Sequence, residues 1–441
     1  MSLGRGALGA VGAQFIVVAA GGLTAVLVAR ALGPEGKGAF TVVTSLAVIL
    51  QQLTSFGVGA ASVRLVATGR ARPVDVIGQA MLVSLGLGAV VSLGLYLLNV
   101  ERPLPILYGI PTVVVALGLA SVPVMQAWLS LQQLSLALRR DIWYAVVMTG
   151  FPLFHLLALA ALWGTGRITL LTAMLAYGGA NLGALVFATV PLWQELRSGR
   201  PRLSRALLWD SVQFGAGRHV VDLSELASRR AGLFVVGAIV GPAAAGMYSV
   251  AVTLGEVGSL LPMSVAPLIF ARTARDASGG AAEVAAQACR VLLALTILIA
   301  LIILAVGPLA VHVLFGNRFD AASQILPWLL PGIICFVAPK ILATALTGEG
   351  KIRAPALVSA GTLVALVAVS VPLVRWQGAI GAAIGTSVGM CIYAVAMIAV
   401  AIRRTRLPLR DYLLPRRGDF VAAKRLVVEL STLPWSRQPT P

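Results

Sequence analysis

The sequence predicts an all-α protein that crosses a membrane about twelve times. Of its 441 residues, 59% are hydrophobic and only 11% are charged, whereas soluble domains carry about 25% charged residues. Apolar runs long enough to cross a bilayer, which takes about 20 residues, recur along nearly the whole chain. Because backbone groups inside lipid must bond within their own segment, we expect these runs to be helices.

The apolar runs define the predicted spans in chain order. They are 8–32, 39–63, 76–99, 106–132, 141–163, 168–192, 213–239, 245–271, 284–314, 322–347, 354–374 and 378–402. The first run resembles a signal peptide, since Arg5 precedes it and Ala29-Arg30-Ala31 ends it. Because the stretch 8–28 is itself long enough to span, we interpret it as an uncleaved first helix.

Positive charge is distributed unevenly over the loops. Of the 34 Lys and Arg residues, 25 fall on the side that carries both termini, five on the other side and four within spans. Cytoplasmic loops are enriched in Lys and Arg, so both termini are predicted to be cytoplasmic. The net charge of +18 is then explained by topology and by anionic lipids, and no nucleic-acid partner is expected.

We predict three parts of the chain: a six-helix half over 1–205, a second over 206–403, and a basic tail over 404–441 that lies on the inner membrane surface. Cys289, Cys335 and Cys391 have no metal-ligand spacing. They are interpreted as small apolar residues within helices, and no metal or other cofactor is expected.

The two halves contain an internal repeat. Gly33-Pro34 and Gly241-Pro242 align at an offset of 208 residues, and Gly38 then aligns with Gly246. Arg64 and Arg272, at the far end of the next helix, align at the same offset. Gly-Pro alone marks many tight turns, but a turn does not require these further matches. An even number of spans per half gives the halves the same orientation, which is a parallel repeat.

Several motifs carry a family resemblance. The turn Ala31-Leu32-Gly33-Pro34-Glu35-Gly36-Lys37-Gly38 resembles the "LGPEGxG" turn after the first helix of polysaccharide biosynthesis flippases, which share a superfamily with multidrug and toxin extrusion transporters. The stretch 240–251 resembles the matching turn of that family's second half. Residues 313–319 are similar to its "LFGxxF" element, 346–351 to its "xxGxGK/R" turn, and 378–383 to its "GxxGAA" entry to the last helix. The matches occur in family order over nearly the whole chain.

This resemblance implies two six-helix bundles facing each other in a V in the bacterial inner membrane. It implies a flippase, not an enzyme, that moves undecaprenyl-diphosphate-linked oligosaccharide outward for surface polysaccharide such as lipopolysaccharide or exopolysaccharide. Expected partners are this lipid-linked cargo, membrane lipids, and a polysaccharide polymerase with chain-length proteins. The resemblance leaves open whether transport is coupled to Na⁺ or to H⁺. The family often carries an Asp near Ala231 or Gly232, and this chain lacks it.

The seventh span carries the main candidate site. Arg218, Asp222, Glu225 and Arg229 are spaced i, i+4, i+7 and i+11, so they form one polar stripe along a helix. Arg230 lies about 100° around the helix from Arg229. An anionic lipid headgroup needs cationic partners inside the membrane, and the Arg fork suits diphosphate. The stripe therefore predicts a substrate site, and the alternative is that its four charges only neutralise one another.

Further candidates are distributed over other spans, each with a plain structural alternative. Arg30 could act late in transport or extend to the interface. Lys340, in a proline-rich tenth span, could line a cavity or serve structure. Glu256 could bind a coupling cation or pair with an Arg of the seventh span. Arg64 and Arg272 could capture diphosphate at the cytoplasmic entrance or act only as topology signals.

The sequence leaves three alternatives to a flippase. A multidrug and toxin antiporter needs uncompensated carboxylates, for which Glu256 is the one candidate. A membrane-embedded glycosyltransferase, polymerase or ligase needs acid–base residues or large outer loops. The predicted outer loops are only a few residues long, with Glu35, Glu101 and Asp320 as their acids. A transport-inactive scaffold is the third alternative.

Overall fold

The computed structural model describes residues 3–273, 281–414, 416 and 419, and over these residues the chain forms helices and short connections without a strand. Nine described helical stretches are long and apolar enough to cross a membrane. Two of them, α1 (Leu3–Ser55) and α14 (Arg353–Thr405), are bent at a glycine with non-helical backbone angles, Gly33 and Gly378. Counting the bent helices as two spans each, and adding the more polar α9 (Arg205–Ile239), agrees with the prediction of about twelve.

The other elements follow the predicted order. The first half continues with α2 (Val58–Ala67), α3 (Pro73–Met81), η1 (Leu82–Leu87), α4 (Gly88–Glu101), η2 (Pro105–Leu107), α5 (Thr112–Ala137), α6 (Asp141–Gly164), α7 (Leu170–Thr189), η3 (Val190–Leu192) and α8 (Trp193–Arg197). After α9, the second half contains α10 (Pro242–Gly255), η4 (Glu256–Ser259), α11 (Leu260–Thr273), α12 (Ala281–Ala310), η5 (Val311–Phe315), η6 (Asn317–Phe319), α13 (Ala322–Gly348), α14 and α15 (Arg410–Leu413).

The predicted second span, 39–63, is broken near its inner end. Phe56 and Gly57 have φ angles of 41° and 70°, so α1 ends at Ser55 and α2 begins at Val58. A bulky L-residue such as Phe56 rarely adopts a positive φ. Gln51, Gln52, Thr54 and Ser55 precede the break, but the apolar residues on either side of this short stretch predicted one continuous span.

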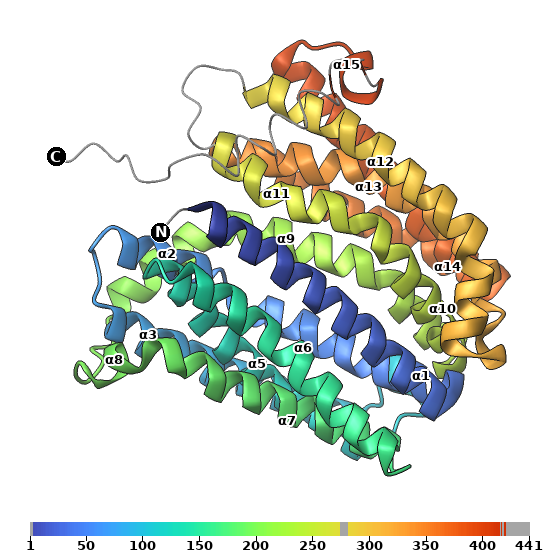
Figure 1. Cartoon of the computed structure of the whole chain (residues 1–441), viewed down its shortest axis with the longest axis horizontal. Helices are drawn as coiled ribbons and strands as arrows, with labels where there is room; N and C mark the ends of the chain where they lie inside the picture. Colours follow the sequence, from blue (N-terminus) through green and yellow to red (C-terminus); the bar gives the residue numbers. More distant parts are fainter. Residues whose placement is uncertain (1–2, 274–280, 415, 417–418, 420–441) are drawn as a thin grey trace.

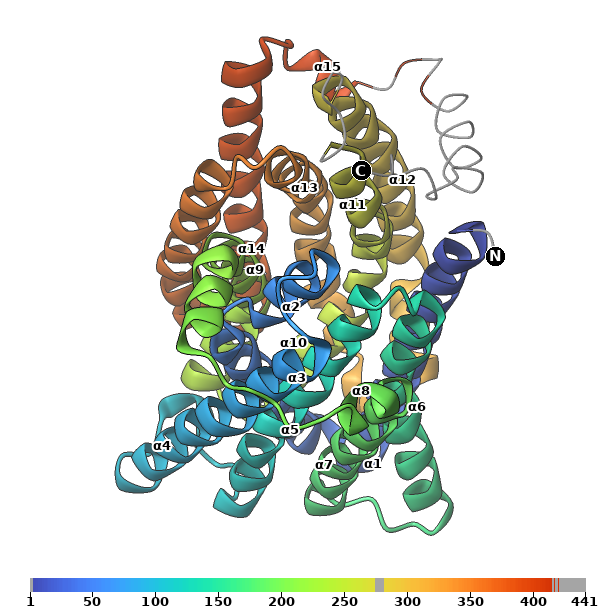
Figure 2. The ribbon, with the colours of Figure 1, turned by 90° about the vertical axis from the view of Figure 1, so that its left-hand side faces the viewer.

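The helices form two groups that correspond to the two halves of the chain. Figure 1 shows α11, α12, α13 and α15 in the upper part and α3, α5, α7 and α8 in the lower part, with α1, α9 and α10 between them. Figure 2 shows the same division from one end, with α11, α12 and α13 above α5, α6 and α7. Across the boundary, α1 packs against α9 and α10, and α2 packs against α9. We call this boundary the seam. We call its end at Gly33 and Gly241 the outer end and its end at α2 the inner end, following the orientation that the loop charges predict.

At the outer end of the seam the two halves share one apolar core. A single buried cluster includes Phe40 and Leu119 from the first half and Tyr248, Phe319 and Leu329 from the second. A second cluster belongs to the second half alone and includes Phe336, Leu366 and Met397. The outer end is therefore packed like a protein interior, which buries apolar surface and holds the halves together there.

The aligned turns of the repeat touch each other at this end. A Cβ atom placed on Gly38 would lie 1.7 Å from the carbonyl oxygen of Pro242. A Cβ atom on Gly246 would lie 1.9 Å from the carbonyl oxygen of Pro34. Each contact is the repeat image of the other, at the offset of 208 residues. Only glycine permits so close an approach of two backbones.

The halves also touch at the inner end. A Cβ atom on Gly57 would lie 2.6 Å from Cα of Gly215 in α9. Nearby, the ring of Phe56 stacks on the imidazole of His219, with the ring centroids 5.7 Å apart. The seam is thus closed by glycine contacts at both ends in this structure.

The start of the predicted tail packs against α12 through polar contacts. Arg290 donates two hydrogen bonds to the two carboxylate oxygens of Asp419, each 2.7 Å long. The Arg290 guanidinium also donates to the backbone carbonyl of Asp411. Both side chains of the Arg290–Asp419 pair are more than nine-tenths buried. The residues beyond 419 lie outside the part that the structure describes, so the predicted membrane-surface position of the tail remains a prediction there.

This contact predicts a specific pH dependence. The hydrogen bonds from Arg290 hold the pKa of Asp419 below its ordinary value. Because this pKa is lower in the folded protein than the unfolded value of about 3.9, the ionised carboxylate stabilises the contact fully at every pH above that value. The stabilisation is lost as the pH falls through the lower pKa of the folded state. Hydrogen–deuterium exchange over 406–419, corrected for intrinsic rates, should therefore not change between pH 7 and pH 5. Asp419→Asn should raise exchange severalfold at pH 7, and equal exchange in both proteins would contradict the contact.

Candidate substrate-binding site

The site is built on α9, the most polar of the long helices. Arg218, Asp222, Glu225 and Arg229 are spaced by three or four residues, so they project from one side of the helix. From this side Glu225 and Arg229 reach η4, α11 and α13, and Arg230 follows Arg229 directly. They divide into two groups along the helix axis. We call the first the inner cluster (Arg218, His219, Asp222, Glu225 and Lys340) and the second the arginine cluster (Arg229, Arg230 and Glu256).

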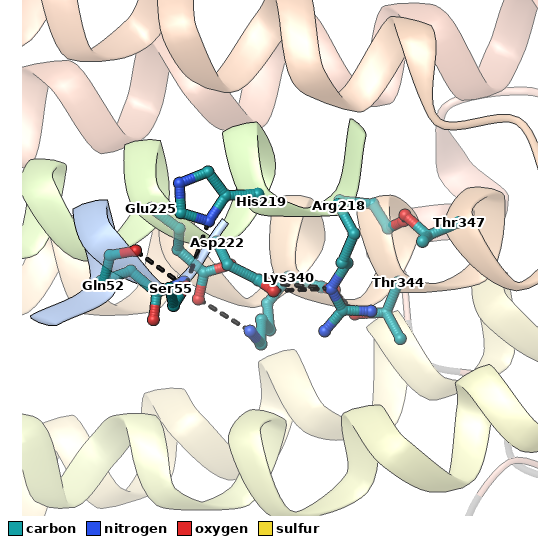
Figure 3. A network of polar contacts seen from close by, with 10 residues as sticks. Gln52, Ser55, Arg218, His219, Asp222, Glu225, Lys340, Thr344 and Thr347 are labelled. Atoms are coloured by element: carbon teal, nitrogen blue, oxygen red, sulfur yellow. Dashed lines mark hydrogen bonds and ion pairs between the residues drawn. The ribbon is translucent and has the colours of Figure 1, made fainter. Parts of the chain in front are cut away.

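The inner cluster is neutral overall. Figure 3 shows its side chains and the ion pairs between them. Arg218 Nε donates to both oxygens of Asp222, at 3.0 and 2.8 Å. Lys340 Nζ, from α13, donates to Glu225 Oε1 at 2.7 Å. His219 Nδ1 lies 3.4 Å from Ser55 Oγ of α1, which places this cluster against the seam. With two cations and two carboxylates, it offers no excess charge to a ligand.

The arginine cluster carries excess positive charge. Arg229 Nη2 donates to Glu256 Oε1 at 2.8 Å. Arg230 Nη2 lies 3.7 Å from the same oxygen. One carboxylate thus serves two guanidinium groups. Arg229 also contacts Met263 Sδ at 3.1 Å and lies over the ring of Phe336, 5.9 Å from its centroid.

A small cavity adjoins this cluster within the second half. Its volume is about 50 Å³, which is room for a few water molecules. Arg229, Glu256, Tyr248, Ser259 and Thr386 supply its polar lining. The rest of its lining is apolar, so the guanidinium of Arg229 is the cationic group at its wall.

The proline-rich helix α13 forms one wall of the cavity. Pro331 interrupts its backbone hydrogen bonds, and the hydroxyl of Ser387 from α14 inserts at the break. Gly332 N donates to Ser387 Oγ at 3.0 Å, and Ser387 Oγ donates to the carbonyl of Trp328 at 2.5 Å. Insertion of a side chain into the helical ladder in this way bends a helix. The prolines of α13 therefore shape this wall of the cavity. Lys340 lies farther along α13 and belongs to the inner cluster.

Arg30 and Arg272 lie away from both clusters. Arg30 reaches across the seam at the outer end and donates to the carbonyls of Leu314, at 2.8 Å, and Val313. It caps the end of η5 and so ties α1 to the second half. Arg272 is exposed at the end of α11. The side chain of Arg64 lies outside the described residues, so its predicted role at the entrance stays a prediction.

Sequence reasoning missed Lys37, which it assigned to an exposed outer loop. The structure buries this side chain at the seam, with 5% of its surface exposed. Its position inside the Gly-Pro turn was the available signal, because a turn that aligns between repeats is a candidate contact between them. Within the described residues no group of three His, Cys, Asp or Glu side chains could hold a metal ion.

Comparisons with solved structures identify the fold. The chain resembles the lipid II flippase MurJ in an inward closed conformation, with a TM-score of 0.71 and 11% identity over 95% of this chain and 96% of that one. It resembles an inward-facing multidrug resistance MATE transporter of the MOP superfamily, with a TM-score of 0.69 and 14% identity over 92% and 95%. It also resembles a MOP superfamily transporter from Pyrococcus furiosus, with a TM-score of 0.64 and 13% identity over 92% and 96%.

Comparisons of sequence identify the family. None of the curated proteins matches the chain. The family model described as "Polysaccharide biosynthesis protein" matches residues 3–271, which is more than half of the 441 residues. The chain therefore belongs to the polysaccharide biosynthesis protein family, and it has the fold of the MOP superfamily flippases and transporters.

Proposed function

We propose that this chain is a flippase that moves an undecaprenyl-diphosphate-linked oligosaccharide outward across the bacterial inner membrane for surface polysaccharide assembly. The observation that carries the proposal is the arginine cluster, in which two guanidinium groups share one carboxylate, and Arg229 and Glu256 of this cluster line a small cavity. The family match supports a polysaccharide precursor as cargo, and the uneven loop charge supports cytoplasmic termini.

The charge of the cluster suits a diphosphate. A lipid tail can remain in the bilayer, but its diphosphate cannot enter hydrocarbon without partners. Arg229 and Arg230 can each donate paired hydrogen bonds to phosphate oxygens. Glu256 neutralises them in part while no cargo is bound, and an arriving diphosphate would take over its role. Glu256 would then be released from Arg229 and Arg230. The cluster would thus have one arrangement without cargo and a second one with the diphosphate bound.

The pairing of the three carboxylates with Arg and Lys favours a flippase over a cation-coupled drug antiporter. Asp222, Glu225 and Glu256 each accept a hydrogen bond from Arg or Lys. A carboxylate held this way is a poor site for a coupling proton or Na⁺, because its charge is already compensated. The coupling ion therefore stays open, and alternating access of the two halves around the seam is part of the proposal.

Deletion of the gene tests this function directly. We expect lipid-linked oligosaccharide to accumulate facing the cytoplasm and surface glycan to disappear, with wild type restoring export. Arg229→Gln/Arg230→Gln/Glu256→Gln should fail to restore it and reduce surface glycan at least about tenfold, the loss expected from one or two charge-assisted hydrogen bonds. Including Glu256→Gln avoids leaving a buried carboxylate unpaired.

Exposed cations of the outer loops provide the matched control. Arg102→Gln/Arg167→Gln removes two positive charges that the structure leaves exposed, and export should be normal. The membrane-inserted amount of each variant is measured alongside. Normal surface glycan after deletion, in a strain without a second such protein, would reject the proposed function.

A further inference from the structure

Lys37 is a buried cation without a partner. Its side chain is 5% exposed, and among the described residues no hydrogen bond or ion pair involves its ammonium group. The other membrane-buried lysine, Lys340, is paired with Glu225 at 2.7 Å. A buried ammonium group is strongly destabilising when it lacks a counter-charge. Among the described residues, the ammonium group of Lys37 therefore has no negatively charged partner.

The groups around Lys37 add positive charge and an unused polar atom. The helix α9, which carries Arg230, packs against α1, which carries Lys37, and the charge of Arg230 disfavours the ammonium form of Lys37. The charge of Lys37 in turn disfavours the protonated form of His155 of α6, whose Nε2 is buried without a hydrogen-bond partner. The imidazole is held in place by stacking on Phe40 and Phe151, with centroids 6.0 and 5.8 Å apart. Two polar groups without partners thus occur on neighbouring helices of the first half.

The helix ends at this point have the same sign. Lys37 lies in the first turn after the bend at Gly33, so it is at the positive end of the second segment of α1. The positive end of α10 begins at Pro242, whose carbonyl is in contact with Gly38. A cation is disfavoured at the N-terminal end of a helix. Two helix ends, Arg230 and Lys37 together form a positive region that an anion would neutralise.

We propose that Lys37, His155 and Arg230 bind the phosphate of a lipid headgroup in the seam, with the first half supplying Lys37 and His155 and the second half supplying Arg230. This inference rests on the proposed function, because it assigns the same diphosphate cargo a second set of contacts. An anion held by both halves would stabilise their contact at the outer end. Binding would then favour the closed outer seam over the open one, which is how a ligand shifts a conformational equilibrium.

Binding of a short isoprenoid diphosphate tests the site without knowledge of the glycan. The full chain, purified in detergent, is titrated with geranyl diphosphate, inorganic diphosphate and geraniol, and unfolding is followed by tryptophan fluorescence. Geranyl diphosphate should raise the Tm of the wild type more than inorganic diphosphate at equal concentration, and geraniol should leave it unchanged. An equal rise with both diphosphates would identify a site for free anions and overturn the assignment to a lipid headgroup.

Lys37→Met is the decisive variant. Without ligand its Tm should be higher than that of the wild type, because an unpartnered buried charge has been removed. Its apparent affinity for geranyl diphosphate should fall at least about tenfold. Lys37→Arg should keep binding within about threefold, and Arg102→Gln, in an exposed loop, should behave as wild type. His155→Phe preserves the ring stacking and should weaken binding severalfold.

Two results would overturn this proposal. Unchanged binding by Lys37→Met would show that the ammonium does not contact the anion, and a lower Tm without ligand would show a structural role. The failures of the two proposals are distinguishable. If deletion blocks export while Lys37→Met binds normally, only this inference is rejected. If deletion leaves the glycan unchanged while Lys37 controls diphosphate binding, only the assignment of the cargo is rejected.

Discussion

Gly38→Ala is expected to hold the outer ends of the two halves apart and to abolish export. The added methyl group would lie 1.7 Å from the carbonyl oxygen of Pro242. The obstacle is backbone at the start of α10 and not a flexible side chain, so the clash cannot be relieved by a rotamer change. The halves must separate by more than 1 Å, which disrupts the packing they share at this end. We expect transport to fall at least about tenfold, since close-packed contacts are lost along the seam.

Two measurements check this expectation. Export is assayed by surface glycan, and Ala39→Cys, in a background without native cysteines, is labelled from outside with an impermeant maleimide. Residue 39 is 3% exposed, so it should be labelled only when the outer seam is open. Gly246→Ala should act like Gly38→Ala, because its clash with Pro34 is the repeat image. Gly22→Ala, whose added methyl meets open space, is the control. Normal export by Gly38→Ala would show that the seam is not closed at this point in the working protein.

Glu225→Gln is expected to destabilise the protein strongly by leaving Lys340 without its counter-charge. The two side chains are only 10% and 16% exposed. Removal of one partner from a buried ion pair costs about 3–5 kcal/mol in proteins, because the remaining charge stays desolvated. The effect should appear as a lower Tm in detergent and less folded protein in the membrane.

The double variant Glu225→Gln/Lys340→Met separates this cause from a loss of packing. It removes both charges and should recover most of the stability. Asp222→Asn is the matched control on the same helix, because the Arg218–Asp222 pair is 41% and 35% exposed and an exposed pair contributes about 0–1 kcal/mol. A double variant as unstable as Glu225→Gln would argue against the ion pair.

Local patterns in the sequence predicted the helices, their number and the repeat. Gly33-Pro34 and Gly241-Pro242 predicted turns between spans, and both glycines have a positive φ in the structure, 66° and 113°. The spacing of four residues also predicted that Arg218 and Asp222 lie side by side on one face of a helix. Such predictions succeed because they depend on residues that are neighbours along the chain.

Partners from distant segments could not be predicted. Glu225 pairs with Lys340, 115 positions away, and not with Arg229 on its own helix. Arg229 turns instead to Glu256 of η4. Lys37 belongs by sequence to an outer loop, and its burial depends on α10 covering it. Arg30, expected to act late in transport or to extend to the interface, donates to the carbonyls of Val313 and Leu314 in η5. In each case the tertiary packing of another helix decides the partner.

The reciprocal contact of Gly38 and Gly246 has the geometry of a homodimer interface. In a two-fold dimer, a residue of one subunit touches a second residue of its partner, and the partner returns the same contact. Here both contacts occur within one chain, as if two parallel subunits had been joined end to end. The charges proposed to bind the cargo do not share this symmetry, because Lys37, Arg229 and Arg230 correspond to Ala245, Gly21 and Gly22 at the offset of 208. The glycine contact that joins the halves therefore exists in two copies and the proposed binding charges in one, so a substitution in one half can change the proposed site and leave both glycine contacts intact.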